Sequence, residues 1–219
     1  MVTKIIDLTQ TLHPSIPVFP VYPKLTIFPW AKREAMGFQA NAVFMVEHTG
    51  THVDAPFHFH RKGRFVADLP VEKFVGEGIL LDFREKVPKG LITGEDLRAA
   101  EKTVGTRIHK HDKVLLYTGW DSHWGKGDYA SSNAGISKDA ADLFVKRQAD
   151  LVGIDSANLD HPDDPSFPAH NTLLPKEVLI VENLCNLGSV RRSRFRFIAL
   201  PLKFKEGTGS PVRAVAIIE

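Results

Sequence analysis

The chain has 219 residues, of which 43% are hydrophobic, and its 28 basic and 26 acidic residues give a formal charge of +2. That length can bury a sizeable core, so we expect one domain over residues 1–219, and the balanced charge argues against a nucleic-acid or anionic-membrane partner. No apolar run approaches the roughly 20 residues that span a bilayer and the start lacks a signal-peptide pattern, so we expect cytoplasmic residence.

Segments rich in β-branched and aromatic residues predict strands, and two amphipathic segments predict helices. A proline-rich segment, 13–30, comes between the first two strands, and its five prolines disfavour a helix or a central strand, so we expect an irregular arm. The helices are expected at 94–102 after the N-cap Thr93 and at 138–148 after Ser137. The strands are expected at 5–8, 40–46, 79–83, 114–118, 151–154, 178–181, 195–202 and 212–218. Because strands outnumber helices, the sequence predicts an α/β domain with mixed sheets.

The chemically informative residues gather in the segment 47–60. His48, His52, His58, His60 and Asp54 all lie there, although the whole chain has only ten histidines. Any one of these histidines alone would more often be a surface group or a hydrogen-bonded core group. That alternative explains the five together poorly, because clustered imidazole and carboxylate groups are the ligands that metal sites use. The sequence therefore favours a metal site, with the role of His60 left undecided.

The spacing of these residues requires a bend. A helix could place His48 and His52 on one face, but Gly50 and its β-branched neighbours oppose a helix. In a straight strand the two histidines would lie roughly 13 Å apart, too far for both to bind one ion. We therefore expect Gly50 to bend the chain. Given the bend, His48, His52 and Asp54 supply a ligand set that suits Zn²⁺, Mn²⁺ or Fe²⁺ and leaves positions for water.

The remaining candidates have plainer interpretations. The role of His161 is left undecided, and Cys185, which has no partner for an intrachain disulfide, is expected to be a small buried residue rather than a nucleophile. The sequence has no Gly-x-Ser-x-Gly elbow, phosphate loop or dinucleotide fingerprint. Four histidines stand in basic, proline-rich or glycine-rich contexts and are expected to be solvated: His13, His109, His111 and His123.

The string His48-Thr-Gly-Thr-His-Val-Asp-Ala-Pro-Phe-His58 resembles the signature of the cyclase-like metal hydrolases, whose best-defined members are the bacterial kynurenine formamidases. The resemblance covers nearly the full length in the family's order. The other matching segments are 6–12, 118–120, 151–156, 169–174, 182–184, 200–204 and 210–215. The resemblance implies a swivelling β/β/α domain that forms homo-oligomers, dimers or tetramers, with pockets near the subunit boundary, where the proline-rich arm would be a natural interface element.

The resemblance also implies a site for two divalent ions, Zn²⁺ in the first place and Mn²⁺ as the alternative. Asp54 would bridge the ions, and His58 would be the general acid/base. From the residues alone Glu182 is only a carboxylate at a strand end, usually a solvated position, so its role depends on the resemblance. The implied ligands are His48, His52, Asp54, His170 and Glu182.

The implied reaction is hydrolysis of a carbon–nitrogen bond in a small molecule, with N-formylkynurenine, which yields kynurenine and formate, as the first candidate. The family pattern has a tryptophan followed by Pro-Gly-Asp where this chain has Phe19-Pro-Val-Tyr-Pro23, so the indole N–H donor is missing. Cyclic amides such as isatin, and lactones, are therefore alternatives, as is a metal-bound binding protein without turnover. Phe19, Trp120 and Trp124 are candidates to line the pocket, with core packing as the alternative for each.

Overall fold

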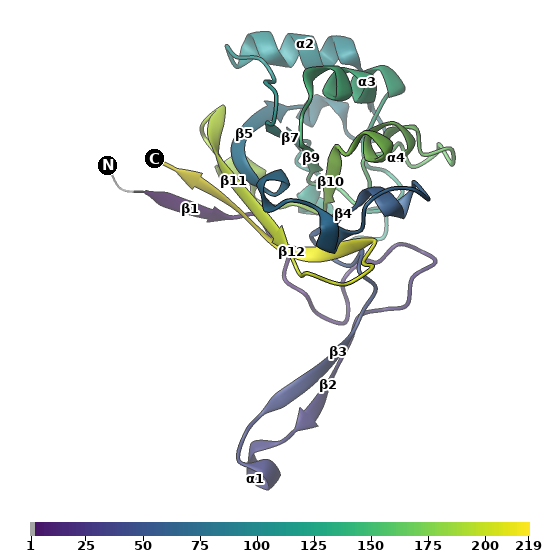
Figure 1. The fold of residues 1–219 in the computed structure, drawn as a ribbon, viewed down its shortest axis with the longest axis vertical. Coiled ribbons are helices and arrows are strands. Elements are labelled where there is room, and N and C mark those ends of the chain that lie inside the picture. Colours follow the sequence, from purple (N-terminus) through teal and green to yellow (C-terminus); the bar gives the residue numbers. More distant parts are fainter. Residues whose placement is uncertain (1–2) are drawn as a thin grey trace.

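The computed structural model describes residues 3–219; Met1 and Val2, at the start considered above, lie outside this range. A mixed eight-stranded sheet forms the body of the molecule (Figure 1). Its central pairs β5–β7–β9–β10 are parallel, and its outer pairs are antiparallel. The order is β1 (Lys4–Asp7), β12 (Gly209–Ile218), β11 (Arg194–Pro201), β5 (Val75–Asp82), β7 (Lys113–Tyr117), β9 (Leu151–Ile154), β10 (Leu179–Glu182) and β4 (His52–Asp54). Because β4 also pairs with the start of β12, the sheet curls round and closes on itself.

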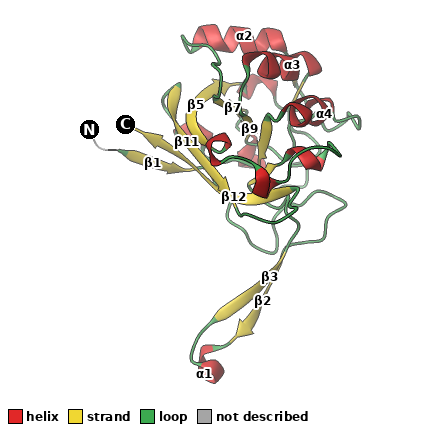
Figure 2. Cartoon of the chain, viewed as in Figure 1, coloured by secondary structure: helices red, strands yellow, loops and turns green. Residues whose placement is uncertain are grey.

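The sheet separates two apolar cores, as β7 illustrates. Val114 and Leu116 belong to the core under the helices, whereas Leu115 points to the core on the other face. This alternation is what a strand with period two produces, and full burial of each such side chain contributes about 1.5–3 kcal/mol. The outer layer holds α2 (Gly94–Thr103), α3 (Lys138–Arg147) and α4 (Pro168–Leu173) (Figure 2). A separate short pair is formed by β6 (Leu91–Ile92) and β8 (Gly135–Ile136).

The predicted secondary structure is confirmed in its main elements. All eight predicted strands and both predicted helices are present, with ends that differ by up to four residues. Thr93 caps α2 in a capping box with Asp96, and the hydroxyl of Ser137 accepts a hydrogen bond from Ala140 N at the start of α3. These caps satisfy backbone N–H groups that a helix start otherwise leaves free.

The expectation of an irregular arm over 13–30 is wrong for its last five residues, 26–30. Residues 26–31 form β2 (Thr26–Ala31), which pairs antiparallel with β3 (Ala40–Phe44). The sheet has only these two strands, so each is an edge, and the pairing shifts between Pro29 and Ala31. An edge strand tolerates a proline because one side of it needs no ladder hydrogen bond.

The β2–β3 hairpin projects far from the body of the molecule, with α1 (Arg33–Met36) at its tip (Figure 1). Two strands alone are marginally stable in water, and this hairpin exposes large apolar side chains. The exposed set is Phe28, Trp30, Met36, Phe38, Val43 and Phe44. Exposure of this kind marks an interaction surface.

No helix within residues 3–219 is long and apolar enough to cross a membrane. Cytoplasmic residence stays a prediction.

Candidate metal centre

The segment that leads into β4 bends at Gly50, as expected. Gly50 has φ +66°, in the left-handed region that glycine enters without steric cost. A Cβ atom there would collide with the Leu12 side chain. The bend brings the rings of His48 and His52 to a centroid distance of 5.3 Å, far less than a straight strand would allow.

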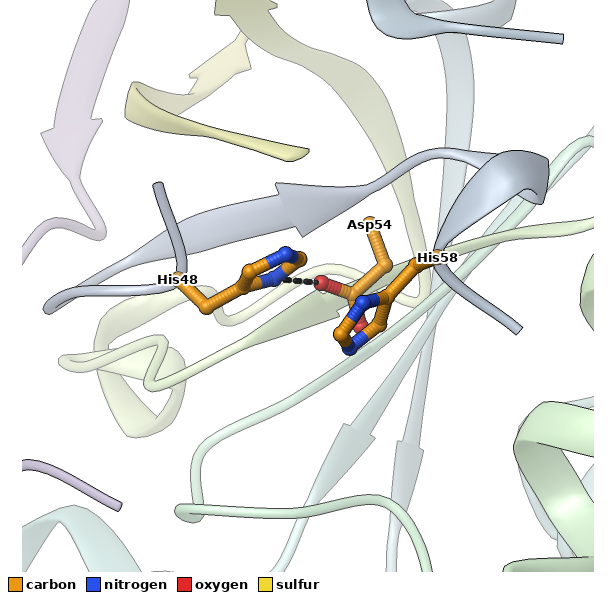
Figure 3. Close-up of side chains that lie close together, drawn as sticks. All are labelled: His48, Asp54 and His58. Carbon is orange, nitrogen blue, oxygen red and sulfur yellow. Dashed lines mark hydrogen bonds and ion pairs between the residues drawn. The ribbon is translucent and has the colours of Figure 1, made fainter. Parts of the chain in front are cut away.

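Asp54 lies at the centre of the cluster. Its Oδ1 is 2.6 Å from Nδ1 of His48 and 3.4 Å from Nε2 of His52, and its Oδ2 is 3.3 Å from Nε2 of His170. Figure 3 shows the first of these contacts, with the His58 ring beside the carboxylate. The two oxygens of one carboxylate therefore face different histidines, which is the geometry that a bridging ligand needs.

The strand register delivers the fifth residue. Glu182, the last residue of β10, pairs directly opposite His52 in the antiparallel β10–β4 ladder. Its Oε2 is 3.7 Å from Nε2 of His52 and its Oε1 is 3.6 Å from Nε2 of His170, which lies in the first turn of α4. No regular spacing in the chain relates residues 52, 170 and 182; tertiary pairing brings them together.

In His48, His52 and His170, the ring nitrogen that points away from Asp54 has a hydrogen-bond acceptor. Nδ1–H of His52 donates to the Gly50 carbonyl at 2.8 Å, and Nδ1–H of His170 donates to Asp160 at 2.5 Å. Nε2–H of His48 donates to the Thr208 hydroxyl at 2.9 Å, because that hydroxyl gives its own hydrogen to Glu47. In each ring the remaining nitrogen points toward Asp54, where an N–H donates to the carboxylate and a lone pair would face a bound cation instead.

The donor set fits a divalent metal. Imidazole nitrogens and carboxylate oxygens are the ligands that Zn²⁺, Mn²⁺ and Fe²⁺ prefer. Two groups have ligand atoms within 4.8 Å of one another, namely His48 with Asp54 and His58, and His52 with Asp54 and Glu182. Geometry alone thus admits His58 as a ligand. Asp54 belongs to both groups.

The pKa shifts in the cluster also indicate a place for positive charge. Burial alone would lower the pKa of His170, but hydrogen bonds to Asp160 and Asp54 outweigh it and raise the pKa to about 10. Burial and the charge of Asp54 raise the pKa of Glu182 to about 7, while the surrounding histidines hold the pKa of Asp54 low despite its burial. His170 and Glu182 therefore hold their protons more tightly than usual, which offsets the negative charge of the buried carboxylates. A bound cation would offset the same charge.

His58 differs from the other histidines of the site. It ends a short 3-10 helix, Pro56–His58, and its ring stacks on His48. Burial lowers its pKa to about 4, with repulsion from the neighbouring histidines acting in the same direction and Asp54 opposing it. Its imidazole is therefore neutral near pH 7 and can accept a proton.

The cluster opens into a cavity of about 130 Å³ with an aromatic rim. Phe19 and Tyr22 contribute from the proline-rich arm, with ring centroids 5.7 Å apart, and Phe59 and Phe167 close the side near His170. The arm therefore contributes to the pocket as well as to the surface. Flat apolar walls around a polar floor suit an aryl ring attached to a carbonyl group.

For the two tryptophans the structure favours the core-packing alternative. Neither Trp120 nor Trp124 is among the lining residues. Trp120 is buried and donates from Nε1–H to the Tyr129 carbonyl at 2.8 Å, and Trp124 packs edge-on against the Tyr129 ring. Both support Tyr129, which does line the pocket, so core packing describes them better. Of the three aromatic candidates only Phe19 reaches the cavity.

The other histidines lie away from the cavity. His13 and His109 are exposed, as expected, and His111 is exposed although it contacts Asp150. His123 is partly exposed, as its expected solvation requires, and its ring stacks on Trp120 with centroids 3.9 Å apart. Neither of the undecided residues, His60 and His161, lines the pocket.

Cys185 is buried, as expected. Burial and the nearby charges of Asp121, Asp7 and Asp155 raise the pKa of its thiol to about 12. The thiolate is the nucleophilic form of cysteine, and at neutral pH almost none of it is present here.

Four residues around the site were not anticipated: Tyr22, Asp160, Asn183 and Thr208. Asn183 follows Glu182 directly and donates to the same Gly50 carbonyl that holds His52. The others stand far from their partners in the chain, and only the tertiary fold relates them.

Comparison with known proteins places this architecture in a family. A family model described as "Putative cyclase" matches residues 6–161. The chain belongs to the cyclase family. Among curated relatives of this chain, the kynurenine formamidase of Bacillus thuringiensis (strain Al Hakam) is 31% identical over 213 residues, covering 96% of this chain and 95% of the relative. The kynurenine formamidase of Bacillus anthracis is 31% identical over 220 residues, covering 97% of each.

Solved structures confirm the expected fold. Isatin hydrolase A from Ralstonia solanacearum superposes with a TM-score of 0.91 at 27% identity, covering 99% of this chain and 92% of that one. An isatin hydrolase bound to the product analogue thioisatinate gives a TM-score of 0.93 at 26% identity with the same coverage. A structure described as a potential metal-dependent hydrolase with cyclase activity gives 0.79 at 26% identity, covering 100% and 99%. The resemblance seen in the sequence is thus confirmed at the level of family and fold.

Proposed function

We propose that this chain is a metal-dependent amide hydrolase, and that it acts as an arylformamidase converting N-formylkynurenine to kynurenine and formate. The observation that carries the proposal is the placement of Asp54, whose two carboxylate oxygens face His48 and His52 on one side and His170 on the other. The kynurenine formamidases similar over nearly the full chain support the substrate. Residues 1–219 would act as one domain, since both cores share the same sheet.

Five side chains would hold two divalent ions, with Zn²⁺ as the first choice and Mn²⁺ as the alternative. His48 and His52 would serve the ion on the Oδ1 side of Asp54, and His170 and Glu182 the ion on the Oδ2 side. Bound divalent ions supply Lewis acidity, which polarises a carbonyl and makes water acidic enough to react near neutral pH.

The protein's own acid/base group in this proposal is His58. Its neutral imidazole lies at the wall of the cavity beside Asp54, and no hydrogen bond to the rest of the described chain occupies its ring nitrogens. His58 would take a proton from water as the water oxygen bonds to the formyl carbon. It would then give that proton to the amine nitrogen as the carbon–nitrogen bond breaks, releasing the arylamine and formate.

The aromatic rim would orient the aryl ring of the substrate. Phe19 and Tyr22 on one side and Phe59 and Phe167 on the other leave a slot above the ligand cluster. A flat ring bound there keeps its amide carbonyl close to the polar floor, which reduces the entropy lost on reaching the transition state.

A second candidate substrate is a cyclic aryl amide such as isatin. Two observations favour it: the structural likeness to isatin hydrolases, and Phe19 in place of a tryptophan, which removes a hydrogen-bond donor from the rim. The chemistry would be the same, with the ring carbon–nitrogen bond as the one that breaks. The non-enzymatic alternative is a protein that binds metal and a small molecule but does not turn the molecule over.

We also propose that the chain forms a homo-oligomer, a dimer or tetramer, through the β2–β3 hairpin. The exposed apolar side chains of the hairpin, Phe28 and Trp30 among them, would be covered by a second copy. Light scattering coupled to size exclusion tests this proposal. The wild type should exceed the 24.4 kDa of one chain, and replacement of Phe28 and Trp30 by serine should shift it to the monomer. A monomeric wild type would refute it.

The function is tested by turnover of N-formylkynurenine, run beside isatin and a simple aryl ester, with protein purified without chelator and with or without added Zn²⁺ or Mn²⁺. Metal-dependent release of kynurenine supports the proposed reaction. Hydrolysis of isatin or the ester alone would retain the metal chemistry and change the substrate. Intact substrates in the presence of confirmed bound metal would refute the enzyme and favour the binding protein.

A further inference from the structure

Asp160 is a fully buried carboxylate that contacts the proposed metal site only through His170. Its Oδ2 accepts a hydrogen bond from Nδ1–H of His170 at 2.5 Å. The same carboxylate also accepts from the backbone N–H of Ala169 at 2.6 Å and of His170 at 3.2 Å. Three donors thus fix the carboxylate, and the carboxylate in turn fixes the plane of the His170 ring.

The loop that carries Asp160 also holds Glu182. The backbone N–H of Leu159 donates to Glu182 Oε1 at 2.8 Å, so residues 159 and 160 orient both ligands on the Oδ2 side of Asp54. The loop is itself held by two further contacts. Asn158 Oδ1 accepts from Asp160 N at 2.7 Å, and a Cβ atom on Gly135 would collide with the backbone of Asp160 and His161.

The Oδ1 side of Asp54 is supported differently. Nδ1–H of His52 is held by a backbone carbonyl, and Nε2–H of His48 is held by the Thr208 hydroxyl, with the Glu47 carboxylate one step further away. Among residues 3–219, Asp160 is therefore the carboxylate that accepts a hydrogen bond directly from the outward-facing ring nitrogen of His48, His52 or His170; the other two rings have neutral acceptors. A carboxylate partner raises the basicity of a metal-binding imidazole more than a neutral acceptor does.

We infer that Asp160 is a positioning residue that makes the two metal positions unequal, with the Asp54–His170–Glu182 position binding its ion more tightly than the His48–His52–Asp54 position. The inference rests on the proposed two-ion site. It predicts that the chain loads stepwise, and that at limiting metal the ion occupies the His170 side first.

A purely structural role is the alternative. Asp160 also satisfies two backbone N–H groups at the start of α4, so its loss could act by loosening that helix. Asn171 offers a matched control. Its side chain supports the same helix start by donating to the Ser166 carbonyl at 2.8 Å, and this contact does not involve His170.

The test is a Zn²⁺ titration of metal-free protein by calorimetry with a competing chelator, for the wild type, Asp160→Asn, Asn171→Ala and Glu47→Gln. We expect two binding steps in the wild type. Asp160→Asn should weaken the tighter step by about 10- to 100-fold and change the other by less than about threefold. Asn171→Ala should change neither. Equal weakening of both steps, or equal behaviour of Asp160→Asn and Asn171→Ala, would overturn the inference.

Two outcomes separate this inference from the proposals it rests on. If the wild type binds one ion only, the two-ion proposal fails. Loss of that ion in Asp160→Asn but not in Glu47→Gln would then still support the role of Asp160. Loss of the ion in Glu47→Gln but not in Asp160→Asn would overturn it. Because the readout is binding, a protein that binds ions but hydrolyses no amide counts only against the proposed reaction.

A measurement on the wild type covers the case in which Asp160→Asn does not fold. Substoichiometric Zn²⁺ should shift the imidazole ¹⁵N signal of His170 before that of His48. The opposite order would overturn the inference.

Discussion

The imidazole of His58 stacks on that of His48, with ring centroids 3.9 Å apart and an interplanar angle of 23° (Figure 3). This places His58 beside the ligand cluster, with one ring nitrogen within 4.8 Å of a carboxylate oxygen of Asp54. His58 makes no hydrogen bond to Asp54, whereas His48 and His170 do. The geometry therefore allows either a proton-transfer role or a ligand role, and the two make different predictions.

Replacement of His58 by alanine should lower turnover by about two to four orders of magnitude, the usual contribution of a general acid/base. Metal content should stay near that of the wild type, because Asp54 and the other four ligands remain. Steady-state kinetics and elemental analysis of the same preparation measure both quantities. A variant that has lost metal would show that His58 is a ligand.

Replacement of Asp54 by alanine should remove both ions. Its two oxygens face opposite sides of the cluster, so no other single side chain can substitute for it. Elemental analysis after gel filtration should find less than about one tenth of the wild-type metal, given the 10- to 100-fold losses that even outer hydrogen-bond partners cause. Asn171→Ala, at the surface of the same region, serves as the control. Full occupancy of one position in the Asp54 variant would contradict a bridging role.

The sequence predicted the strands, the two long helices and the cluster at 48–58, because each depends on local pattern. Val114, Leu115 and Leu116 alternate between two cores, and Gly50 marks the bend that the histidine spacing required. Local pattern has little information about β4, a strand of only three residues that exists because β10 and β12 pair with it.

The same limit explains the site residues that were missed. The contact of Asp160 with His170 spans ten positions in irregular chain, and the contact of Thr208 with His48 spans 160. No periodicity relates such pairs. His170 and Glu182 are expected only through the family resemblance. For Trp120 and Trp124 the sequence leaves lining and core packing open, because an aromatic residue that supports a pocket wall has the same sequence signature as one that lines it.

Phe19 should affect substrate binding more than the chemical step. It lines the cavity from the proline-rich arm, lies at a tilted angle against Tyr22 and is 39% exposed, so it can be changed without opening the core. Phe19→Ala should raise KM for aryl amides by about fivefold to twentyfold, since an aromatic contact contributes roughly 0.5–1.5 kcal/mol beyond its buried area. Phe19→Trp is the matched variant and should retain or lower KM. A fall in kcat with unchanged KM in Phe19→Ala would contradict this role.

Asp150 should be important for stability at the end of the sheet away from the site. Its carboxylate lies 3.0 Å from Nζ of Lys73 and 3.2 Å from Nζ of Lys113, whose side chain is only 3% exposed. Asp150→Asn leaves the Lys113 ammonium buried without its counter-charge, and such a loss costs about 3–5 kcal/mol in the free energy of unfolding. The half-exposed pair Arg64–Glu177 supplies the control, and Glu177→Gln should cost less than about 1 kcal/mol.

The effect of Asp150 should also depend on pH in a defined direction. Burial alone would raise the pKa of Asp150, but the contacts with His111, Lys73 and Lys113 outweigh it and lower the pKa below its usual value. A carboxyl group whose pKa is lowered by folding stabilises the protein above its unfolded pKa of about 3.9 and loses that contribution as pH falls through the folded value. Urea unfolding at neutral pH and near pH 3 should therefore show a large difference between wild type and Asp150→Asn that shrinks in acid. A difference that stays constant or grows would mean that Asp150 contributes through packing rather than charge.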